Sequence, residues 1–177
     1  MVVKITYFVH GTTTDNEEHK GTGWNPGKLS KLGIEQAKQL GKIVVDKKFD
    51  AVFCSDLKRS IDSAELVFKN KYKIVIDKRL RECNYGDWNG KKKDWKNVDF
   101  IDKKYPNGES YKDVEKRISA FLKLLKEKYD GQHIAIVAHQ APQLALDVLI
   151  KGKTWHQAIE ECWRKRKAWQ PGWDYRY

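Results

Sequence analysis

Four side chains spread along the sequence have the chemical types needed to move a phosphoryl group: His10, Arg59, Glu82 and His139. A neutral imidazole is a nucleophile toward phosphorus, and a guanidinium holds phosphate oxygens through paired N–H donors. A carboxylic acid protonates a leaving oxygen, and a second, cationic imidazole balances charge on the group in transfer. A lone histidine is more often structural, so the interpretation depends on whether the fold brings these four residues together.

Both histidines directly follow stretches with the pattern of β-strands. Strands are expected at residues 3–9, 51–55, 73–76 and 133–138, and the segments between them carry apolar residues at helical spacing. This alternation predicts parallel pairing in a three-layer α/β/α sandwich with a mostly parallel central sheet. Ligands bind beyond the carboxyl ends of such strands, so residues 10–12, 55–56 and 139–140 should meet at one edge of the sheet.

Three helices are expected from their caps and apolar faces. The first begins at Ser30, the second follows Ser55, and the third follows a capping box formed by Ser110 and Asp113. The apolar residues assigned to these faces are, in order, Ile34, Ala37, Gly41 and Val44; Leu57, Ile61, Ala64 and Phe68; Tyr111, Val114, Ile118, Phe121 and Leu125.

Length and composition favour one domain spanning residues 1–177, with a real core and a cytoplasmic location. The chain is 40% hydrophobic, and it has neither the roughly 20-residue apolar run of a membrane helix nor a signal peptide. Its three cysteines lack metal-ligand spacing and cannot all pair, which favours free thiols over a disulfide framework or a zinc site. The net charge of +11 favours anionic ligands, although dispersed lysines are more typical of a solvated basic surface than of a nucleic-acid-binding face.

Several separate motifs, in order along residues 3–150, make the chain resemble the histidine phosphatase superfamily, also called phosphoglycerate mutase-like. The family's R-H-G-x-T-x-x-N is matched by "FVHGTTTDN" at 8–16, and its V-x-H-G by "IAIVAHQAP" at 134–142. The other matching stretches are "GTGWNPGKLSKLG", "VFCSDLKRSIDSAE", "LRECNYGDWNG" and "PNGES".

The resemblance implies a role for each matching position. His10 would be the nucleophile that becomes phosphorylated, Glu82 the general acid and later the base toward water, and Arg59 and His139 the walls of the phosphate pocket. The family requires no metal or other cofactor. Further substrate contacts fall on Asn16, Thr22, Gly23 and Tyr85; of these, Asn16, Thr22 and Tyr85 can equally be turn or packing residues.

The chain departs from the family pattern directly before the nucleophile, where Val9 replaces an arginine that grips phosphoryl oxygens in the family. Three outcomes are open. The backbone amides of Gly11 and Thr12, with the hydroxyls of Thr12 and Thr13, can bind the oxygens. A cation from the "RKRK" run at 164–167 can take the place of the arginine, or the pocket has lost catalysis and binds an anion.

A second departure lies after the second histidine, where Gln140 replaces a glycine and alters the substrate pocket wall. Residues 84–107 form a polar, irregular stretch, interpreted as a loop or cap over the site. The tail at 163–177 mixes tryptophan with basic residues; it can stack on bases, but packing against the domain is the favoured interpretation.

These observations predict a metal-independent phosphomonoester hydrolase that forms a phosphohistidine from a small phosphorylated metabolite and releases inorganic phosphate. Hydrolysis is preferred to phosphoglycerate mutase-like transfer because the chain has only a small cap to keep water from a phosphohistidine. A catalytically silent protein that binds phosphate or nucleic acid is the alternative from another class. A membrane partner is not expected, and nucleic acid is not excluded by the basic charge.

Overall fold

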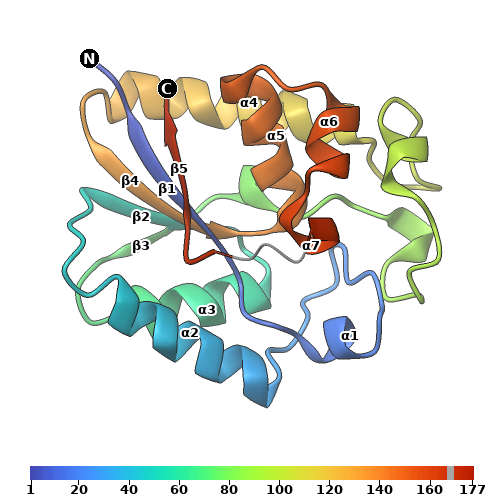
Figure 1. The fold of residues 1–177 in the computed structure, drawn as a ribbon, viewed down its shortest axis with the longest axis horizontal. Coiled ribbons are helices and arrows are strands. Elements are labelled where there is room, and N and C mark those ends of the chain that lie inside the picture. The colour runs from blue at the N-terminus through green and yellow to red at the C-terminus, as the bar shows by residue number, and fades with distance from the viewer. Residues whose placement is uncertain (167–169) are drawn as a thin grey trace.

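The computed structural model describes residues 1–166 and 170–177, and it forms a five-stranded sheet between two layers of helices (Figure 1). The strand order is β3-β2-β4-β1-β5, with β1 to β4 parallel and β5 antiparallel to β1. The fold class predicted from the sequence is confirmed. The strands are β1 (Lys4–Val9), β2 (Ala51–Cys54), β3 (Ile74–Ile76), β4 (His133–Ala138) and β5 (Trp173–Arg176).

Side-chain alternation along the central strand β4 builds the two cores of the molecule. Ile134 and Ile136 face one core, and Ala135 and Val137 face the other. Both faces are therefore buried, which is why this strand is continuously apolar.

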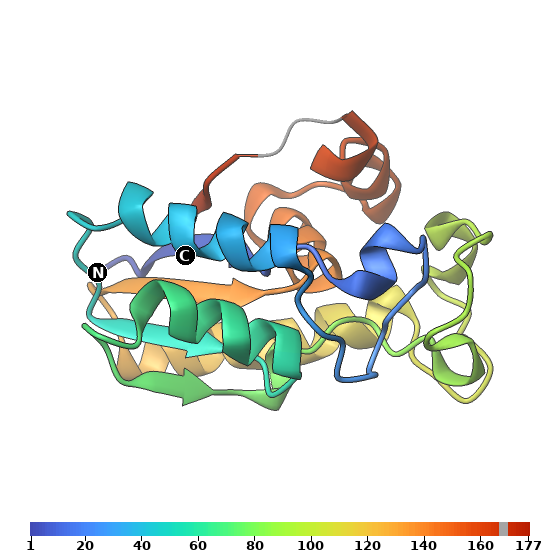
Figure 2. The ribbon, with the colours of Figure 1, turned by 90° about the horizontal axis from the view of Figure 1, so that it is seen from below.

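Helices α2 (Lys31–Ile43) and α3 (Lys58–Phe68) cover one face, while α4 (Tyr111–Lys128) and α5 (Gln140–Lys151) cover the other (Figures 1 and 2). The three helices predicted from the sequence correspond to α2, α3 and α4. Ser30 caps α2, and the capping box of Ser110 and Asp113 is present at the start of α4. Ile34, Gly41 and Ile61 are only half-buried.

Residues 84–107 extend past the end of the sheet and contain the 3₁₀ turns Gly86–Trp88 and Asn97–Phe100 (Figure 1). An aromatic cluster holds this cap segment together. Trp88 lies 5.3 Å, between ring centroids, from both Trp95 and Phe100, and Phe100 stacks on Tyr105 at 3.8 Å. Phe100 and Tyr105 belong to the larger core of the domain, and Trp88 and Trp95 pack against it, so the cap segment is continuous with that core. The other short elements are α1 (Thr14–Glu17) and the 3₁₀ turn Lys78–Leu80.

The C-terminal tail packs against the domain, as favoured from the sequence. After α6 (Trp155–Glu160) and the single turn α7 (Trp163–Arg166), the chain returns to the sheet as β5, where Trp173 and Tyr175 are buried. Lys167 of the "RKRK" run and Trp169 lie outside the described residues. Among the helices that are described, none is long and apolar enough to cross a membrane.

Candidate active site

The carboxyl ends of β1, β2 and β4 bring His10, Ser55 and His139 together. The two imidazole rings lie 5.1 Å apart between centroids, at an interplanar angle of 60°. The turn after His10 requires glycine, because a Cβ on Gly11 would lie 2.3 Å from the carbonyl oxygen of Gly33 in α2. The backbone therefore passes in direct contact with α2 as it leaves β1.

Hydrogen bonds at both ring nitrogens fix the orientation and the tautomer of His10. Its Nδ1 lies 2.7 Å from the carbonyl oxygen of Gly11, so Nδ1 carries the proton and donates it. The other nitrogen, Nε2, accepts from Nε–H of Arg59 at 3.3 Å. Burial, followed by the charge of Arg59, lowers the pKa of His10 well below its ordinary value. The imidazole is therefore neutral near pH 7, as a nucleophile must be.

Arg59 lies in the first turn of α3 and is 1% exposed. Its Nη1 donates to the carbonyl oxygens of Asn25 and Pro26 at 2.8 and 3.3 Å, and its Nη2 donates to Gly23 at 2.8 Å. A guanidinium has five N–H donors. These contacts leave Arg59 two donors for a phosphoryl group, the Nε–H facing His10 and one N–H on Nη2.

His139 is the N-cap residue of α5 and is completely buried. Its Nε2 lies 2.6 Å from Ser55 Oγ, which also accepts from the amide of Leu57, while Nδ1 has no hydrogen-bond partner within the described chain. Burial and the charge of Arg59 lower the pKa of His139 well below its usual value. The imidazolium expected from the sequence is thus a neutral ring in the ligand-free site.

Glu82 joins the site from the loop that follows β3, and backbone amides at the start of α5 hold its carboxylate. Oε1 accepts from Cys83 at 2.9 Å and Ala141 at 3.0 Å, and Oε2 accepts from Gln140 at 3.2 Å. Two N–H donors occupy Oε1, whereas Oε2 accepts a single, longer hydrogen bond. The position left for a transferable proton is on Oε2.

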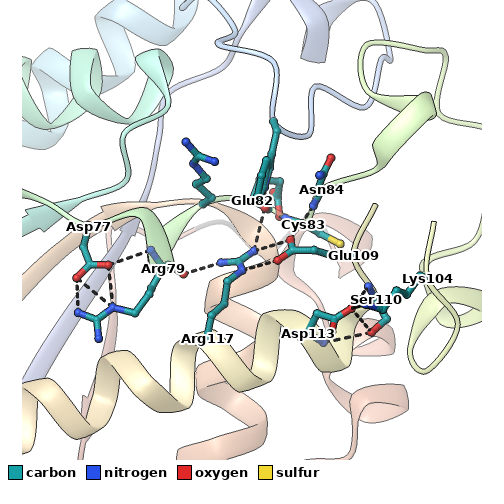
Figure 3. Close-up of polar contacts among 12 residues, drawn as sticks. Asp77, Arg79, Glu82, Cys83, Asn84, Lys104, Glu109, Ser110, Asp113 and Arg117 are labelled. Carbon is teal, nitrogen blue, oxygen red and sulfur yellow. Dashed lines mark hydrogen bonds and ion pairs between the residues drawn. The ribbon is translucent and has the colours of Figure 1, made fainter. Parts of the chain in front are cut away.

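A half-buried ion pair between Arg117 and Glu109 fixes the loop that carries Glu82 (Figure 3). Arg117 on α4 donates to the carbonyl oxygens of Arg79 at 2.5 Å and Glu82 at 2.9 Å, and its Nε pairs with Glu109 at 2.9 Å. Glu109 in turn accepts from the amide of Asn84 at 2.9 Å. The loop is therefore clamped on both sides of Glu82.

These groups surround a pocket of about 260 Å³. His139 lies beside His10 without lining the pocket. Asn16 uses Oδ1 to cap α1 through the amide of Thr13, which leaves its Nδ2 available, and Thr22 Oγ1 is buried with no partner among the described residues. The sequence-predicted residues that line the pocket are His10, Asn16, Thr22, Gly23, Arg59, Glu82, Tyr85 and Gln140.

The structure corrects the expectation that Gly11, Thr12 and Thr13 bind phosphate oxygens. The amide of Gly11 donates to Ser63 Oγ at 3.0 Å, and both the amide and the hydroxyl of Thr12 donate to Gln36 at 2.9 Å. The hydroxyl of Thr13 caps α1 by accepting from the amide of Asn16 at 3.1 Å, and none of the three residues lines the pocket. These groups are committed to shaping the turn after β1, so they do not replace the arginine that is absent at Val9.

Sequence reasoning missed four pocket residues, namely His19, Lys20, Gly21 and Lys93, and left Arg164 as one of several basic residues in a run. The pKa of Lys93 is lowered, mainly by burial; the negative charge of the nearby Glu82 acts in the opposite direction. The positive charge of Arg164 contributes to lowering the pKa values of His10, Arg59 and His139. Arg164 is exposed on α7 and lines the pocket, so the C-terminal segment contributes a cation to the site.

Comparison with known proteins places this geometry in context. The sequence profile of the histidine phosphatase superfamily (branch 1) matches residues 7–166. The adenosylcobalamin/alpha-ribazole phosphatase of Escherichia coli strain K12 is 29% identical over 91% of this chain and 88% of its own. A phosphoglycerate mutase of Schizosaccharomyces pombe is 29% identical over 85% of this chain and 81% of its own.

A solved structure, Bacillus stearothermophilus YhfR, superimposes with a TM-score of 0.79 at 26% identity, covering 88% of this chain and 83% of that one.

Proposed function

The chain belongs to the histidine phosphatase superfamily (branch 1), and we propose that it hydrolyses phosphomonoesters through a phosphohistidine at His10. The observation that carries this proposal is the orientation of His10. Its Nδ1–H donates to Gly11 at 2.7 Å, so the lone pair of Nε2 faces the pocket. Its lowered pKa keeps Nε2 unprotonated near neutral pH, with the lone pair held by a long hydrogen bond from Arg59 at 3.3 Å.

In the first step, His10 Nε2 attacks phosphorus, a P–N bond forms, and the bond from phosphorus to the ester oxygen breaks. The proton on Oε2 of Glu82 moves to the departing oxygen, which leaves as the alcohol. In the second step, the Glu82 carboxylate takes a proton from water, the resulting hydroxide attacks phosphorus, and the P–N bond breaks. Inorganic phosphate leaves, and both residues return to their starting states.

Arg59 and His139 bind the oxygens of the group in transfer. Arg59 supplies the uncommitted N–H on Nη2, and also its Nε–H, which turns from His10 Nε2 to a phosphoryl oxygen when that nitrogen attacks. For His139, one consistent assignment of hydrogens has the Ser55 hydroxyl donating to Nε2 at 2.6 Å, so that Nδ1–H is free to donate to a ligand. A bound dianion also favours the cationic form of this ring, which burial suppresses in the empty site.

Arg164 takes the place of the arginine missing at Val9. Val9 is packed against the larger core, and the amides of the Gly11–Thr13 turn are already used. Arg164 lines the pocket and has no carboxylate within ion-pair distance among the described residues. Together with Arg59 it places two guanidinium groups at the transferring phosphoryl group.

Two results together test the phosphohistidine route. Phosphate release from a panel of phosphomonoesters, with EDTA present, should be measurable for the wild type and lost in His10→Ala. His156→Ala is the matched control, because His156 is exposed on α6, outside the pocket, and its loss should change nothing. Turnover that survives in His10→Ala, or that EDTA abolishes, would contradict the proposal.

The phosphoglycerate mutase relative makes phosphoryl transfer the second candidate. It predicts isomerisation of a phosphoglycerate without net release of phosphate. Folded protein that binds phosphate but turns over no ester would indicate a silent binding protein instead.

A further inference from the structure

A second cavity, of about 580 Å³, opens beside the proposed phosphoryl pocket. The two cavities share Lys93 and Gln140 in their linings, so they lie side by side with these two side chains at their boundary. This second cavity, the side groove, lies between the cap segment 93–98 on one side and the α5 and α6 helices on the other. Its apolar walls are Trp95, Val98, Leu144, Ile159 and Cys162.

The walls of the side groove are fixed by packing. Trp95 lies 5.3 Å, between ring centroids, from both Tyr85 and Trp88, within the aromatic cluster of the cap. On the opposite side, Leu144 is 1% exposed and Ile159 is 5% exposed. The groove is therefore a preformed apolar surface, which is typical of small-molecule sites.

Four charged side chains line the side groove: Lys93 at the boundary with the phosphoryl pocket, and Lys96, Glu160 and Lys165 away from it. Lys93 Nζ lies 5.4 Å from the Tyr85 ring centroid and 5.9 Å from that of Trp95, so the ammonium group is held over aromatic faces. Lys165, at the outer edge of the groove, is paired with Glu160 at 2.6 Å. A ligand with its phosphoryl group at His10 meets Lys93 at the boundary, and beyond it the five apolar side chains together with the exposed Lys96 and the Lys165–Glu160 pair.

We propose that the side groove binds the alcohol half of the substrate, which is therefore a bulky and largely apolar group, aromatic or alicyclic, rather than a two- or three-carbon polar unit. This inference rests on the proposed phosphatase function, because it assumes that the ester's phosphoryl group lies at His10. The ester oxygen then passes between Lys93 and Gln140. A groove of this volume falls within the roughly 300–1,000 Å³ range of ligand pockets, well above the needs of a glycerate.

Equilibrium binding to the His10→Ala protein tests the groove without requiring turnover. Calorimetric titration with 1-naphthyl phosphate and ethyl phosphate should give at least tenfold tighter binding of the naphthyl ester, a ratio that burial of about 60 Å² of apolar surface provides. Adding Val98→Trp fills the groove and should reduce this ratio to about one, while leaving the affinity for inorganic phosphate unchanged.

Leu66→Trp is the matched control, because Leu66 lies in an unrelated surface cavity between α2 and α3 and the same large side chain there should leave the ratio intact. Asn97→Trp, at a half-buried groove position, replaces Val98→Trp if the latter does not fold.

Equal binding of the two esters, or a ratio that neither groove variant changes, would overturn the proposal. The fate of the phosphatase proposal is read separately from turnover by the wild type. A naphthyl preference that depends on Val98, found in a protein that releases no phosphate, supports the groove and contradicts the hydrolase. Turnover by the wild type with no preference for the larger ester supports the hydrolase and contradicts the groove.

Discussion

Replacing Arg164 with alanine tests whether a cation from the C-terminal segment completes the phosphoryl site. Arg164 lies on α7, lines the pocket, and influences the pKa values of His10, Arg59 and His139 through its charge. Arg59 cannot supply every donor, because three of its N–H contacts go to backbone carbonyls of residues 23–26. A phosphoryl group therefore needs a further donor, and Arg164 is placed to provide it.

The size of the effect follows from the strength of a charged hydrogen bond. Such a bond contributes about 1.5–3 kcal/mol, which corresponds to roughly 12- to 160-fold in rate if it acts in the transition state. Arg164 is exposed to solvent, so water screens its charge and the lower end applies. We expect kcat/KM of Arg164→Ala to fall about tenfold, and the difference to shrink as ionic strength rises.

The assay compares kcat/KM for p-nitrophenyl phosphate and the inhibition constant of inorganic phosphate in two variants. Arg166→Ala removes the same charge from the same helical turn, at an exposed position outside the pocket, and should change either constant less than twofold. Equal losses of kcat/KM in the two variants would show that the effect comes from the overall positive charge of this surface and not from a contact made by Arg164. If Arg164→Ala alters neither constant, another group compensates for Val9 and the assignment of Arg164 is wrong.

Two further predictions concern the groups behind the pocket. Arg117→Met removes the clamp on the loop of Glu82. Because the Arg117 side chain is 15% exposed and paired with Glu109, its loss should lower the free energy of unfolding by about 2–3 kcal/mol and Tm by roughly 4–12 °C. Its kcat should fall more than its KM rises, and a variant with wild-type Tm and kcat would contradict the clamp. His10 and His139 have lowered pKa values when folded, so the unfolded chain binds more protons below the ordinary histidine pKa of about 6.5. Stability present above that pH should be lost as pH falls, by roughly 1.4 kcal/mol per pH unit for each histidine. Urea unfolding between pH 7.5 and 5 should show about half of the wild-type slope in His10→Ala, because His139 remains, and an unchanged slope would contradict the assignment.

The sheet and the main helices could be predicted because their signals are local. The four parallel strands are short apolar runs, and Ser30 and Ser110 cap helices where their sequence positions indicate. The edge strand β5 was missed, although "WDYR" alternates apolar and polar residues and its Trp173 and Tyr175 are indeed the buried ones. The alternation was obscured by the basic and aromatic residues before it.

The composition of the pocket was harder to predict, because proximity across the fold has no local signature. Nothing in the sequence around Arg164 separates it from Lys165 and Arg166, and Lys93 is one of three successive lysines. The turn at Gly11 was misinterpreted because its local signal was misleading. Its amides have the types suited to phosphate binding, but their partners, such as Ser63, come from helices whose approach only the packed structure reveals.

The position of β1 in the sheet has a consequence for how the protein is made. Both neighbours of β1 lie far along the chain: Lys4 pairs with His133, made 129 positions later, and with Arg176. At about 5–20 residues per second, a ribosome exposes the apolar β1 for roughly 6 to 26 s before β4 has even been synthesised. During that interval the exposed strand is a binding site for chaperones. The proposed nucleophile, His10, has no active site around it until β4 and His139 have been synthesised.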